Sequence, residues 1–202
     1  MPLISVEDIA VGVKLGLWKI EETVDDFFTY DPGLLFLKQA LCAYGSVQRR
    51  LEVLAVHSLL HEIQGRHELL RHNADGKPGL DSGLNVSVSH TKGCAAVIVS
   101  MQGRVAVDVE YLSDRVGRVA RKMLRKDEFA TDLHRLMLHW CAKETLYKLY
   151  SEDHLALEDM RLLSMDGTYN VGTVKMENVQ RGETLDVFYR FFDGFVLTYA
   201  VL

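Results

Sequence analysis

The chain contains few prolines and cysteines, and these shortages exclude several kinds of protein. Its 202 residues include 3 prolines and 3 cysteines, so no linker rich in Pro, Gly or Ser separates one part from another. The cysteines are Cys42, Cys94 and Cys141, which are widely spaced and never arranged as Cys-x-x-Cys. This pattern suggests neither a disulfide framework nor a thiolate zinc site, and it predicts a reducing, cytoplasmic environment.

Further absences concern membranes and nucleic acids. No apolar run approaches the roughly 18 residues that a membrane-spanning helix needs. The first residues lack the basic head and long apolar core of a signal peptide. The formal net charge of −5 gives no general attraction to nucleic acid or to an anionic membrane. The 48% hydrophobic and 25% charged residues suit a globular unit, or two small halves that share a core.

Apolar periodicity predicts an α+β protein. Strands are expected over 11–20, 85–90, 95–101 and 105–110, and over most of the last fifty residues, with hairpin turns at Asp166-Gly167 and Asp193-Gly194. Helices are expected over 46–63 with Ser46 as the cap, over 114–130 and over 133–150, and mixed helix and loop over 22–44. Each half, residues 1–102 and 103–202, thus has a small, mostly antiparallel sheet and a long helix.

Two carboxylates interrupt a strand of valines. Residues 105–110 read Val-Ala-Val-Asp-Val-Glu, so Asp108 and Glu110 share one face and the valines share the other. Carboxylates that close repel each other and raise the pKa of at least one of them. A divalent cation would remove the repulsion. The alternative is a solvated strand surface, which is the commoner outcome for so short a motif.

A third carboxylate, Glu144, falls on an apolar stripe of the last predicted helix. The same stripe contains Leu133, Met137, Trp140 and Tyr147. A carboxylate there is either desolvated or paired. The plain alternative is a surface ion pair with Lys148, worth about 0.3–0.5 kcal/mol. Three oxygen donors without cysteine suit Mg²⁺ better than Zn²⁺, and Lys143 and Lys148 would supply counter-charge for the phosphates that complete its coordination.

Polar and basic residues elsewhere offer phosphate contacts. Ser89 and His90 end a strand and could donate to a phosphate, although an ordinary polar strand end is equally compatible. Lys77 lies in a turn, where it is either a ligand contact or solvated. Basic residues also recur at three- and four-residue steps: Arg115, Arg118, Arg121, Lys122, Arg125 and Lys126. Such a stripe is usually a solvated helix face, and otherwise a dock for an acidic macromolecule.

Several catalytic motifs are missing. His57 and His61 are four residues apart on a predicted helix, but the glutamate of His-Glu-x-x-His is absent, so a zinc protease is unsupported. The sequence contains neither a Gly-x-Ser-x-Gly elbow nor a Walker phosphate loop. These absences leave the carboxylates and lysines as the main chemical signal.

In their order, the remaining motifs resemble the 4′-phosphopantetheinyl transferases of the surfactin-synthetase-activating type. The resemblance covers about residues 46–150. It is carried by residues 49–56, 76–78, 86–91 and 107–110, by Glu128, and by Trp140-x-x-Lys143-Glu144-x-x-x-Lys148. Each motif alone is modest, but the ordered set is specific. The first 45 residues and the last 50 add little to it.

The resemblance implies a fold and a set of site residues. It implies two halves related by a pseudo-two-fold, with the active site and coenzyme A between them. Mg²⁺ would be held by Asp108, Glu110 and Glu144, which together with Lys148 form the implied catalytic set. The residues implied to contact coenzyme A are Arg49, Arg50, Lys77, Ser89, His90, Lys143 and Lys148. Glu128 matches a family glutamate without an assigned role.

The implied activity is that of a transferase. It would move 4′-phosphopantetheine from coenzyme A to a serine of an apo acyl or peptidyl carrier protein, releasing adenosine 3′,5′-bisphosphate. The carrier would dock on the basic stripe from Arg115 to Lys126, and the enzyme is expected to act as a monomer. Fatty-acid, polyketide, non-ribosomal-peptide and siderophore carriers all remain open. The general base is also open between a metal-bound water and a nearby carboxylate.

One departure from the family pattern raises alternatives. Where many relatives have arginine in the long helix, this chain has His57, which would make coenzyme A binding weaker or more sensitive to pH. A non-catalytic protein that binds coenzyme A or a carrier while retaining the fold is therefore the alternative hypothesis. Another Mg²⁺-dependent phosphoryl-transfer enzyme, such as a phosphohydrolase, is a third.

Overall fold

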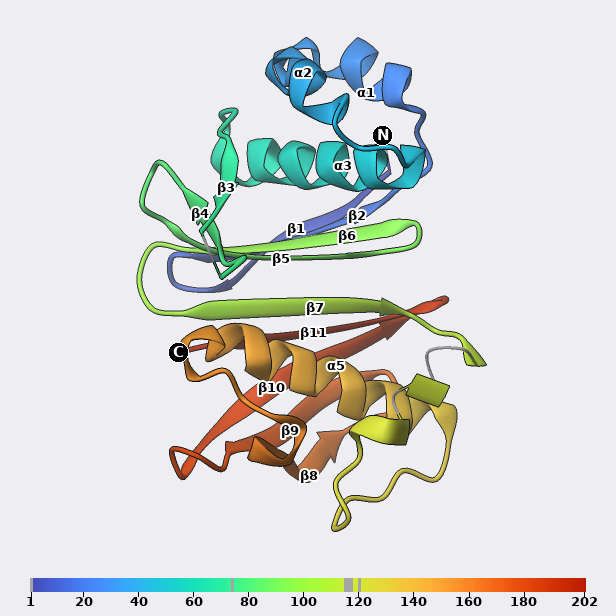
Figure 1. The fold of residues 1–202 in the computed structure, drawn as a ribbon, viewed down its shortest axis with the longest axis vertical. Coiled ribbons are helices and arrows are strands. Elements are labelled where there is room, and N and C mark those ends of the chain that lie inside the picture. Colours follow the sequence, from blue (N-terminus) through green and yellow to red (C-terminus); the bar gives the residue numbers. More distant parts are fainter. Residues whose placement is uncertain (1, 74, 115–117, 120) are drawn as a thin grey trace. The chain divides into compact units, whose positions relative to one another are not determined.

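The computed structural model describes residues 2–73, 75–114, 118–119 and 121–202. Its contacts divide the chain into two compact units, Met1–Gly103 and Arg104–Leu202. The boundary between them lies one residue after the boundary that the sequence predicts. Each unit has an antiparallel sheet with one long helix packed against it (Figure 1). The predicted α+β class is confirmed.

The first unit is built on a four-stranded antiparallel sheet of order β1-β2-β6-β5. Its strands are β1 (Leu3–Ala10), β2 (Val13–Lys19), β5 (Asn85–Thr91) and β6 (Cys94–Ser100). Three of them match predicted strands, and β1 is additional. A small hairpin of β3 (Leu70–His72) and β4 (Pro78–Leu80) precedes β5. Gly93, with a φ of 79°, makes the tight turn from β5 to β6 because glycine tolerates this conformation.

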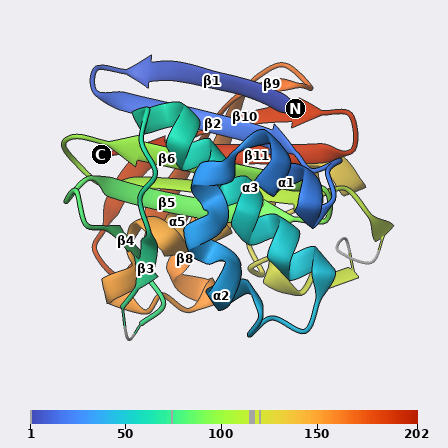
Figure 2. The ribbon, with the colours of Figure 1, turned by 90° about the horizontal axis from the view of Figure 1, so that it is seen from above.

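Helix α3 (Val47–Gln64) lies against this sheet, as seen from above in Figure 2. The predicted cap is confirmed: the Ser46 hydroxyl accepts the N–H of Arg49, and Gly65 ends the helix at a φ of 71°. The contact is close because Gly16 has no side chain, and a Cβ there would lie 2.9 Å from Cδ2 of Leu59. Shorter helical segments complete the unit: α1 (Val24–Tyr30), η1 (Pro32–Leu37) and α2 (Lys38–Leu41).

The second unit has a five-stranded antiparallel sheet of order β7-β11-β10-β9-β8. Its strands are β7 (Val105–Tyr111), β8 (Met160–Gly167), β9 (Val171–Asn178), β10 (Glu183–Phe192) and β11 (Phe195–Val201). The predicted turn at Asp193-Gly194 is confirmed, whereas β8 continues through Gly167 and its turn follows at 168–170. Helix α5 (Leu133–Leu149), capped by Asp132, packs on this sheet as the sequence predicts. Short turns η3 (Ser151–Asp153) and η4 (Leu157–Asp159) connect it to β8.

The expected continuous helix over 114–130 is wrong in its second half. Its described part contains the turn η2 (Arg121–Met123), but residues 124–130 are not helical. The N–H of Glu128 donates to the Arg125 carbonyl at 3.1 Å, and the Arg125 N–H donates to the Glu128 carboxylate at 2.9 Å. This local turn replaces helical hydrogen bonds. The predicted basic stripe is therefore not one helical face, and its first member, Arg115, lies outside the described residues.

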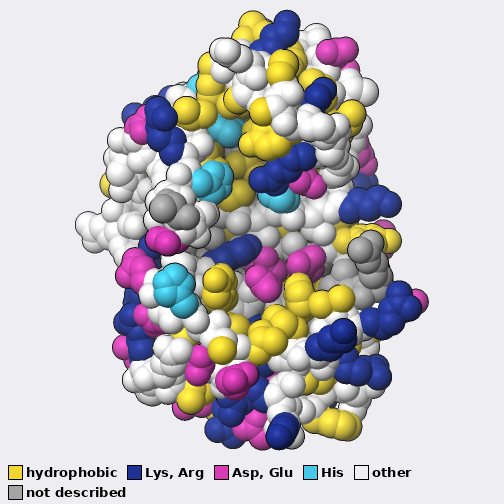
Figure 3. All heavy atoms as spheres, in the orientation of Figure 1, with side chains coloured by type: hydrophobic (Ala, Val, Ile, Leu, Met, Phe, Trp, Pro, Cys, Tyr) yellow, Lys and Arg dark blue, Asp and Glu magenta, His cyan; other side chains and the backbone are white. Residues whose placement is uncertain are grey.

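The charges on the surface and the hydropathy of the helices agree with the composition of the sequence. Basic and acidic side chains are interspersed on the face shown in Figure 3. Within the described part of the chain, no helix is both long and apolar enough to cross a membrane.

Candidate functional site on β7 and α5

Strand β7 and helix α5 bring four of the predicted site residues into one cluster. The Asp108 carboxylate accepts hydrogen bonds from the side chains of Lys148 and Cys141, and Glu110 accepts one from Nε1 of Trp140 at 3.0 Å. All three donors belong to α5, so Asp108 and Glu110 both face this helix. We call Asp108, Glu110, Glu144 and Lys148 the acidic cluster.

Asp108 is the most buried member of the acidic cluster, with 3% of its surface exposed. Its Oδ1 lies 2.7 Å from Nζ of Lys148, and its Oδ2 lies 3.0 Å from Sγ of Cys141. Lys148 also donates to the carbonyl of Val107 at 3.0 Å. Burial raises the pKa of the Cys141 thiol well above its usual value, so the sulfur keeps its proton and donates a hydrogen bond to Asp108.

The two glutamates hold their protons more tightly than ordinary carboxyls. Burial raises the pKa of Glu110 to about 7, and the charges of Asp108 and Glu144 add to this rise. The Trp140 hydrogen bond and Lys148 oppose it. Burial and Asp108 also raise the pKa of Glu144, which Lys148 partly offsets. One lysine thus faces three carboxylates, and such mutual repulsion is typical of sites that hold a cation.

The donor chemistry of the acidic cluster fits Mg²⁺. Its carboxylates supply hard oxygen donors, and the neighbouring thiol is protonated and therefore a poor ligand. Among the described residues, however, three potential ligands whose atoms lie within 4.8 Å of one another occur at Asp31, His61 and His67, and not in this cluster. Asp108, Glu110 and Glu144 would therefore close on one ion by rotating their side chains.

Glu144 does not lie on the buried face of α5. The buried face contains Leu138, Ala142, Leu146 and Leu149. Of the predicted stripe, Met137 is fully buried, Trp140 and Glu144 are half-buried, and Leu133 and Tyr147 are 37% and 41% exposed. The predicted stripe therefore follows the core only in part, because α5 has apolar residues on several sides and its periodicity does not single out one. Lys148 pairs with Asp108 on strand β7, and this pair takes the place of the predicted surface pair between Lys148 and Glu144.

Lys143 is held in a different environment from the acidic cluster. Its side chain is fully buried, and Nζ donates to Oε2 of Glu128 at 2.5 Å and to the carbonyl of Met123 at 2.8 Å. Burial lowers the pKa of Lys143, and the Glu128 carboxylate opposes this. Glu128 also accepts the N–H of Leu162 at 2.8 Å, so the pair connects α5, the 121–128 segment and β8. The Lys143 ammonium thus contacts Met123 and Glu128, and its role there is to stabilise the fold.

In the first unit, α3 and β5 bring together two of the predicted coenzyme A contacts. Arg49 and His90 touch each other and share a carboxylate oxygen of Glu52, at 3.3 Å from Nη1 of Arg49 and 3.1 Å from Nδ1 of His90. The sequence analysis did not assign a role to Glu52, although its position three residues after Arg49 on a helix is a signal for such a pair. Arg50 instead donates to the Tyr44 carbonyl at 2.8 Å.

Ser89 and Lys77 are placed apart from that pair. Ser89 is 7% exposed and neighbours His90 on β5, so the two side chains point to opposite faces of the sheet. Lys77 lies in the exposed turn before β4, where its backbone N–H donates to Oδ1 of Asn73 at 2.9 Å. Among the predicted contacts of the first unit, the structure thus brings the side chains of Arg49 and His90 together.

His57 is a buried histidine with both ring nitrogens in contact with the backbone. Nδ1 lies 2.8 Å from the Val53 carbonyl, and Nε2 lies 3.4 Å from the Leu70 nitrogen. These partners require a proton on Nδ1 and none on Nε2, which is the neutral ring. Burial lowers the pKa of His57 and keeps it neutral. His57 is therefore part of the buried interior of the first unit.

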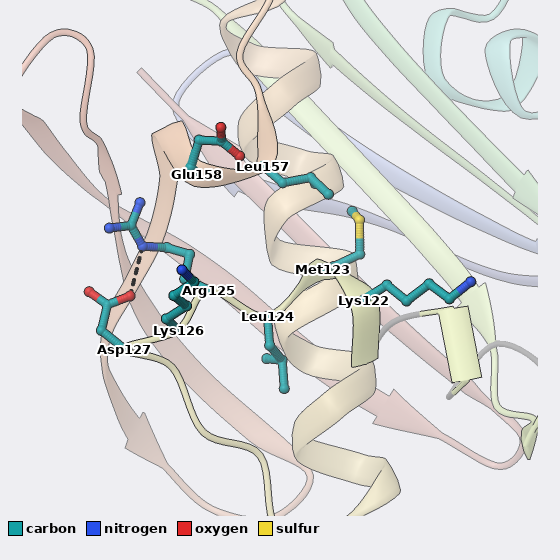
Figure 4. A pocket seen from close by; sticks show the side chains of 8 residues that line it. All are labelled: Lys122, Met123, Leu124, Arg125, Lys126, Asp127, Leu157 and Glu158. Carbon is teal, nitrogen blue, oxygen red and sulfur yellow. Dashed lines mark hydrogen bonds and ion pairs between the residues drawn. The ribbon is translucent and has the colours of Figure 1, made fainter.

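Three basic residues of the predicted stripe border a cavity of about 560 Å³ (Figure 4). Its lining includes Lys122, Arg125, Lys126, Asp127 and Glu158. Nε of Arg125 lies 2.9 Å from Oδ1 of Asp127, so part of the positive charge is neutralised locally. Arg118 and Arg121 border a second cavity of about 360 Å³.

Comparison with models of known protein families and with curated proteins found no match. The functional assignment therefore rests on the residues of this chain and on their geometry.

Proposed function

We propose that the protein is a Mg²⁺-dependent 4′-phosphopantetheinyl transferase that uses coenzyme A and modifies a serine of an apo carrier protein. The observation that carries the proposal is the acidic cluster. Asp108, Glu110 and Glu144 stand in the order and spacing of the family motif, and two of them have raised pKa values because of burial and mutual repulsion. A cation bound with a pyrophosphate would offset that repulsion.

The proposed reaction forms one bond to phosphorus and breaks another. The serine hydroxyl oxygen attacks the β-phosphorus of coenzyme A, and the bond from that phosphorus to the bridging oxygen breaks. The electron pair leaves with adenosine 3′,5′-bisphosphate, and phosphopantetheine remains on the serine. Such transfers depend on positioning and on neutralisation of charge more than on covalent help from the protein.

The side chains of the acidic cluster have distinct proposed roles. Asp108, Glu110 and Glu144 would hold Mg²⁺, which when bound neutralises charge on the pyrophosphate oxygens. Lys148, held 2.7 Å from Asp108, adds a positive charge beside them. The serine proton goes to a carboxylate of the cluster or to a water molecule.

Coenzyme A is proposed to contact residues of both units. In the first unit Arg49, His90 and Lys77 are the proposed phosphate contacts, with Arg50 and Ser89 as further candidates. The proposal includes the pseudo-two-fold relation of the units that the family resemblance implies. Lys143 is proposed to act indirectly, because its ammonium is paired with Glu128 inside the second unit. The carrier would be an acidic protein that contacts the basic residues from Arg118 to Lys126, and the enzyme would act as a cytoplasmic monomer.

The test is transfer to apo carrier proteins of several pathways. The protein is incubated with coenzyme A, Mg²⁺ and each carrier, and intact-mass analysis follows the addition of one phosphopantetheine. Asp108→Ala should abolish transfer, whereas Asp186→Asn, which changes an exposed carboxylate outside the cluster, should not. Folded protein that modifies no carrier would contradict the proposal.

Two further measurements separate the alternatives. Calorimetry that shows tight coenzyme A binding without transfer would favour the non-catalytic binding protein. Release of inorganic phosphate from small phosphate esters would favour a phosphohydrolase.

A further inference from the structure

A second cluster of potential ligands lies in the first unit and shares no residue with the acidic cluster. Asp31 ends α1, His61 lies in the last turn of α3, and His67 follows that helix. One ligand atom from each residue lies within 4.8 Å of the others. We call Asp31, His61 and His67 the histidine cluster. Its members are up to 36 residues apart in the chain, which is why no sequence motif signals them.

The contacts within the histidine cluster leave two nitrogens unused. Nε2 of His67 lies 3.1 Å from Oδ1 of Asp31, and the rings of His61 and His67 stack with centroids 4.1 Å apart. The Nδ1 atoms of both histidines are buried, and among the described residues neither has a hydrogen-bond partner. Buried polar atoms are normally paired, so two adjacent exceptions call for a ligand or water. An unprotonated imidazole nitrogen is a common metal ligand.

The backbone around the histidine cluster is arranged to admit these side chains. Oδ1 of Asp31 accepts the Gly33 N–H at 3.1 Å, which fixes the carboxylate at the start of η1. A Cβ on Gly33 would lie 2.0 Å from Nε2 of His67, so only glycine leaves room for the ring in this position. Phe36 packs beside the same ring, with centroids 6.2 Å apart. The carboxylate and one imidazole are thus held together by the surrounding structure.

We propose that the histidine cluster binds a divalent transition-metal ion of the zinc class. Two imidazoles and one carboxylate form a common three-residue ligand set for zinc and leave a position open for water. Mg²⁺ prefers oxygen ligands and is not expected to bind there. Binding requires the stacked rings to rotate apart so that a lone pair of each points at the ion. The ion would join the α1–η1 segment to the C-terminal end of α3. This proposal does not depend on the transferase function.

Calorimetry on the full-length protein tests the proposal with ZnCl₂ and, separately, MgCl₂. We expect one saturable zinc site in the first titration and an increase in the melting temperature with zinc. His61→Gln and His67→Gln should each weaken zinc binding by at least tenfold. His72→Gln changes an exposed histidine outside the cluster and should leave zinc binding unchanged. Equal zinc affinity in the wild type and both cluster variants would overturn the proposal, as would the absence of zinc binding.

Two further measurements keep the test decisive if a histidine variant fails to fold. Asp31→Asn retains an oxygen that can accept the Gly33 N–H but removes the charge, so it should fold and bind zinc more weakly. Co²⁺ added to the wild type should produce the visible absorption bands of nitrogen-ligated cobalt, and Zn²⁺ should remove them. Cobalt spectra identical to those of free Co²⁺ would overturn the proposal. Because these readouts are binding and absorption, they are independent of any transfer activity.

Discussion

Nζ of Lys143 lies 2.5 Å from Oε2 of Glu128, and the two side chains are 0% and 2% exposed. Burying a charged lysine and a charged glutamate costs free energy of solvation. The attraction between the two charges offsets that cost, so each residue depends on the other. The Glu128 carboxylate also accepts backbone N–H groups of Arg125 and Leu162. The pair therefore holds a non-helical segment against α5 and β8.

Removal of one member of this pair should be strongly destabilising. Lys143→Met is expected to lower the free energy of unfolding by about 3–5 kcal/mol, because it leaves the buried Glu128 charge without its lysine partner. Adding Glu128→Gln should recover part of the loss. Urea denaturation provides the measurement. Lys175→Met is the matched control, because it breaks an exposed pair with Asp186 and should cost about 1 kcal/mol or less. Equal losses in the two lysine variants would contradict the structural role of Lys143.

Asp108→Asn should remove activity while retaining the fold. Loss of this charge removes a proposed metal ligand and the partner of Lys148, so we expect transfer to fall by about 100-fold or more. Lys148 is 27% exposed and can turn to water, which limits the loss of stability. Transfer rates and circular dichroism, measured together, check both expectations. A variant with wild-type transfer at saturating Mg²⁺ would remove Asp108 from the site.

Glu110 should make stability depend on pH when no divalent cation is present. Its pKa is about 7 in the folded protein against 4.5 for an ordinary glutamate, so the folded state binds this proton more tightly. The free energy of unfolding should therefore decrease as the pH rises from about 4.5 to 7, and this contribution should stay constant above that range. Urea denaturation in a chelator should show a smaller decrease for Glu110→Gln. An unchanged pH profile in that variant would contradict the assignment.

His57 should produce the opposite dependence. Burial lowers its pKa below the usual 6.5, so the unfolded chain binds this proton more tightly than the folded one. The contribution of neutral His57 to the free energy of unfolding should be fully present above pH 6.5 and should decrease as the pH falls below it. His57→Gln should reduce this dependence, although it costs stability at every pH. His154→Asn is the control, since His154 is exposed and asparagine tolerates its φ of 50°. Thermal unfolding across pH 5–8 distinguishes the two, and identical slopes would contradict the role of His57.

Gly172 should not tolerate a side chain. A Cβ there would lie 2.2 Å from the carbonyl oxygen of Asp166, a backbone atom in the paired strand β8. Gly172→Ala is expected to cost about 1–3 kcal/mol, because the strands must separate locally. Gly45→Ala is the matched control: its Cβ would meet open space, and reduced freedom of the unfolded chain should stabilise by about 0.4–1 kcal/mol. Equal denaturation midpoints for the two variants would contradict the close approach of β8 and β9.

Local patterns in the sequence were sufficient for most of the elements. Helix α3 begins at Ser46 and ends at Gly65 because a capping hydroxyl and a glycine act within a few residues of the helix ends. Strand β7 follows from alternation, which also places Asp108 and Glu110 on the face toward α5. The acidic motif could be recognised in the sequence because Asp108 and Glu110 are only two residues apart on one strand. That the protein transfers phosphopantetheine remains a prediction.

Long-range contacts decided what the sequence alone could not. The helix expected over 114–130 does not continue over 124–130, where Glu128 accepts the Arg125 N–H and pairs with Lys143 of α5. Lys143 is fully buried and Glu144 is half-buried, which the periodicity could not predict because α5 is apolar on several sides. Asp31, His61 and His67 meet only because the chain folds back on itself. Periodicity reports the order of nearby residues, whereas burial and pairing depend on which distant segments pack together, and that is set by the tertiary structure.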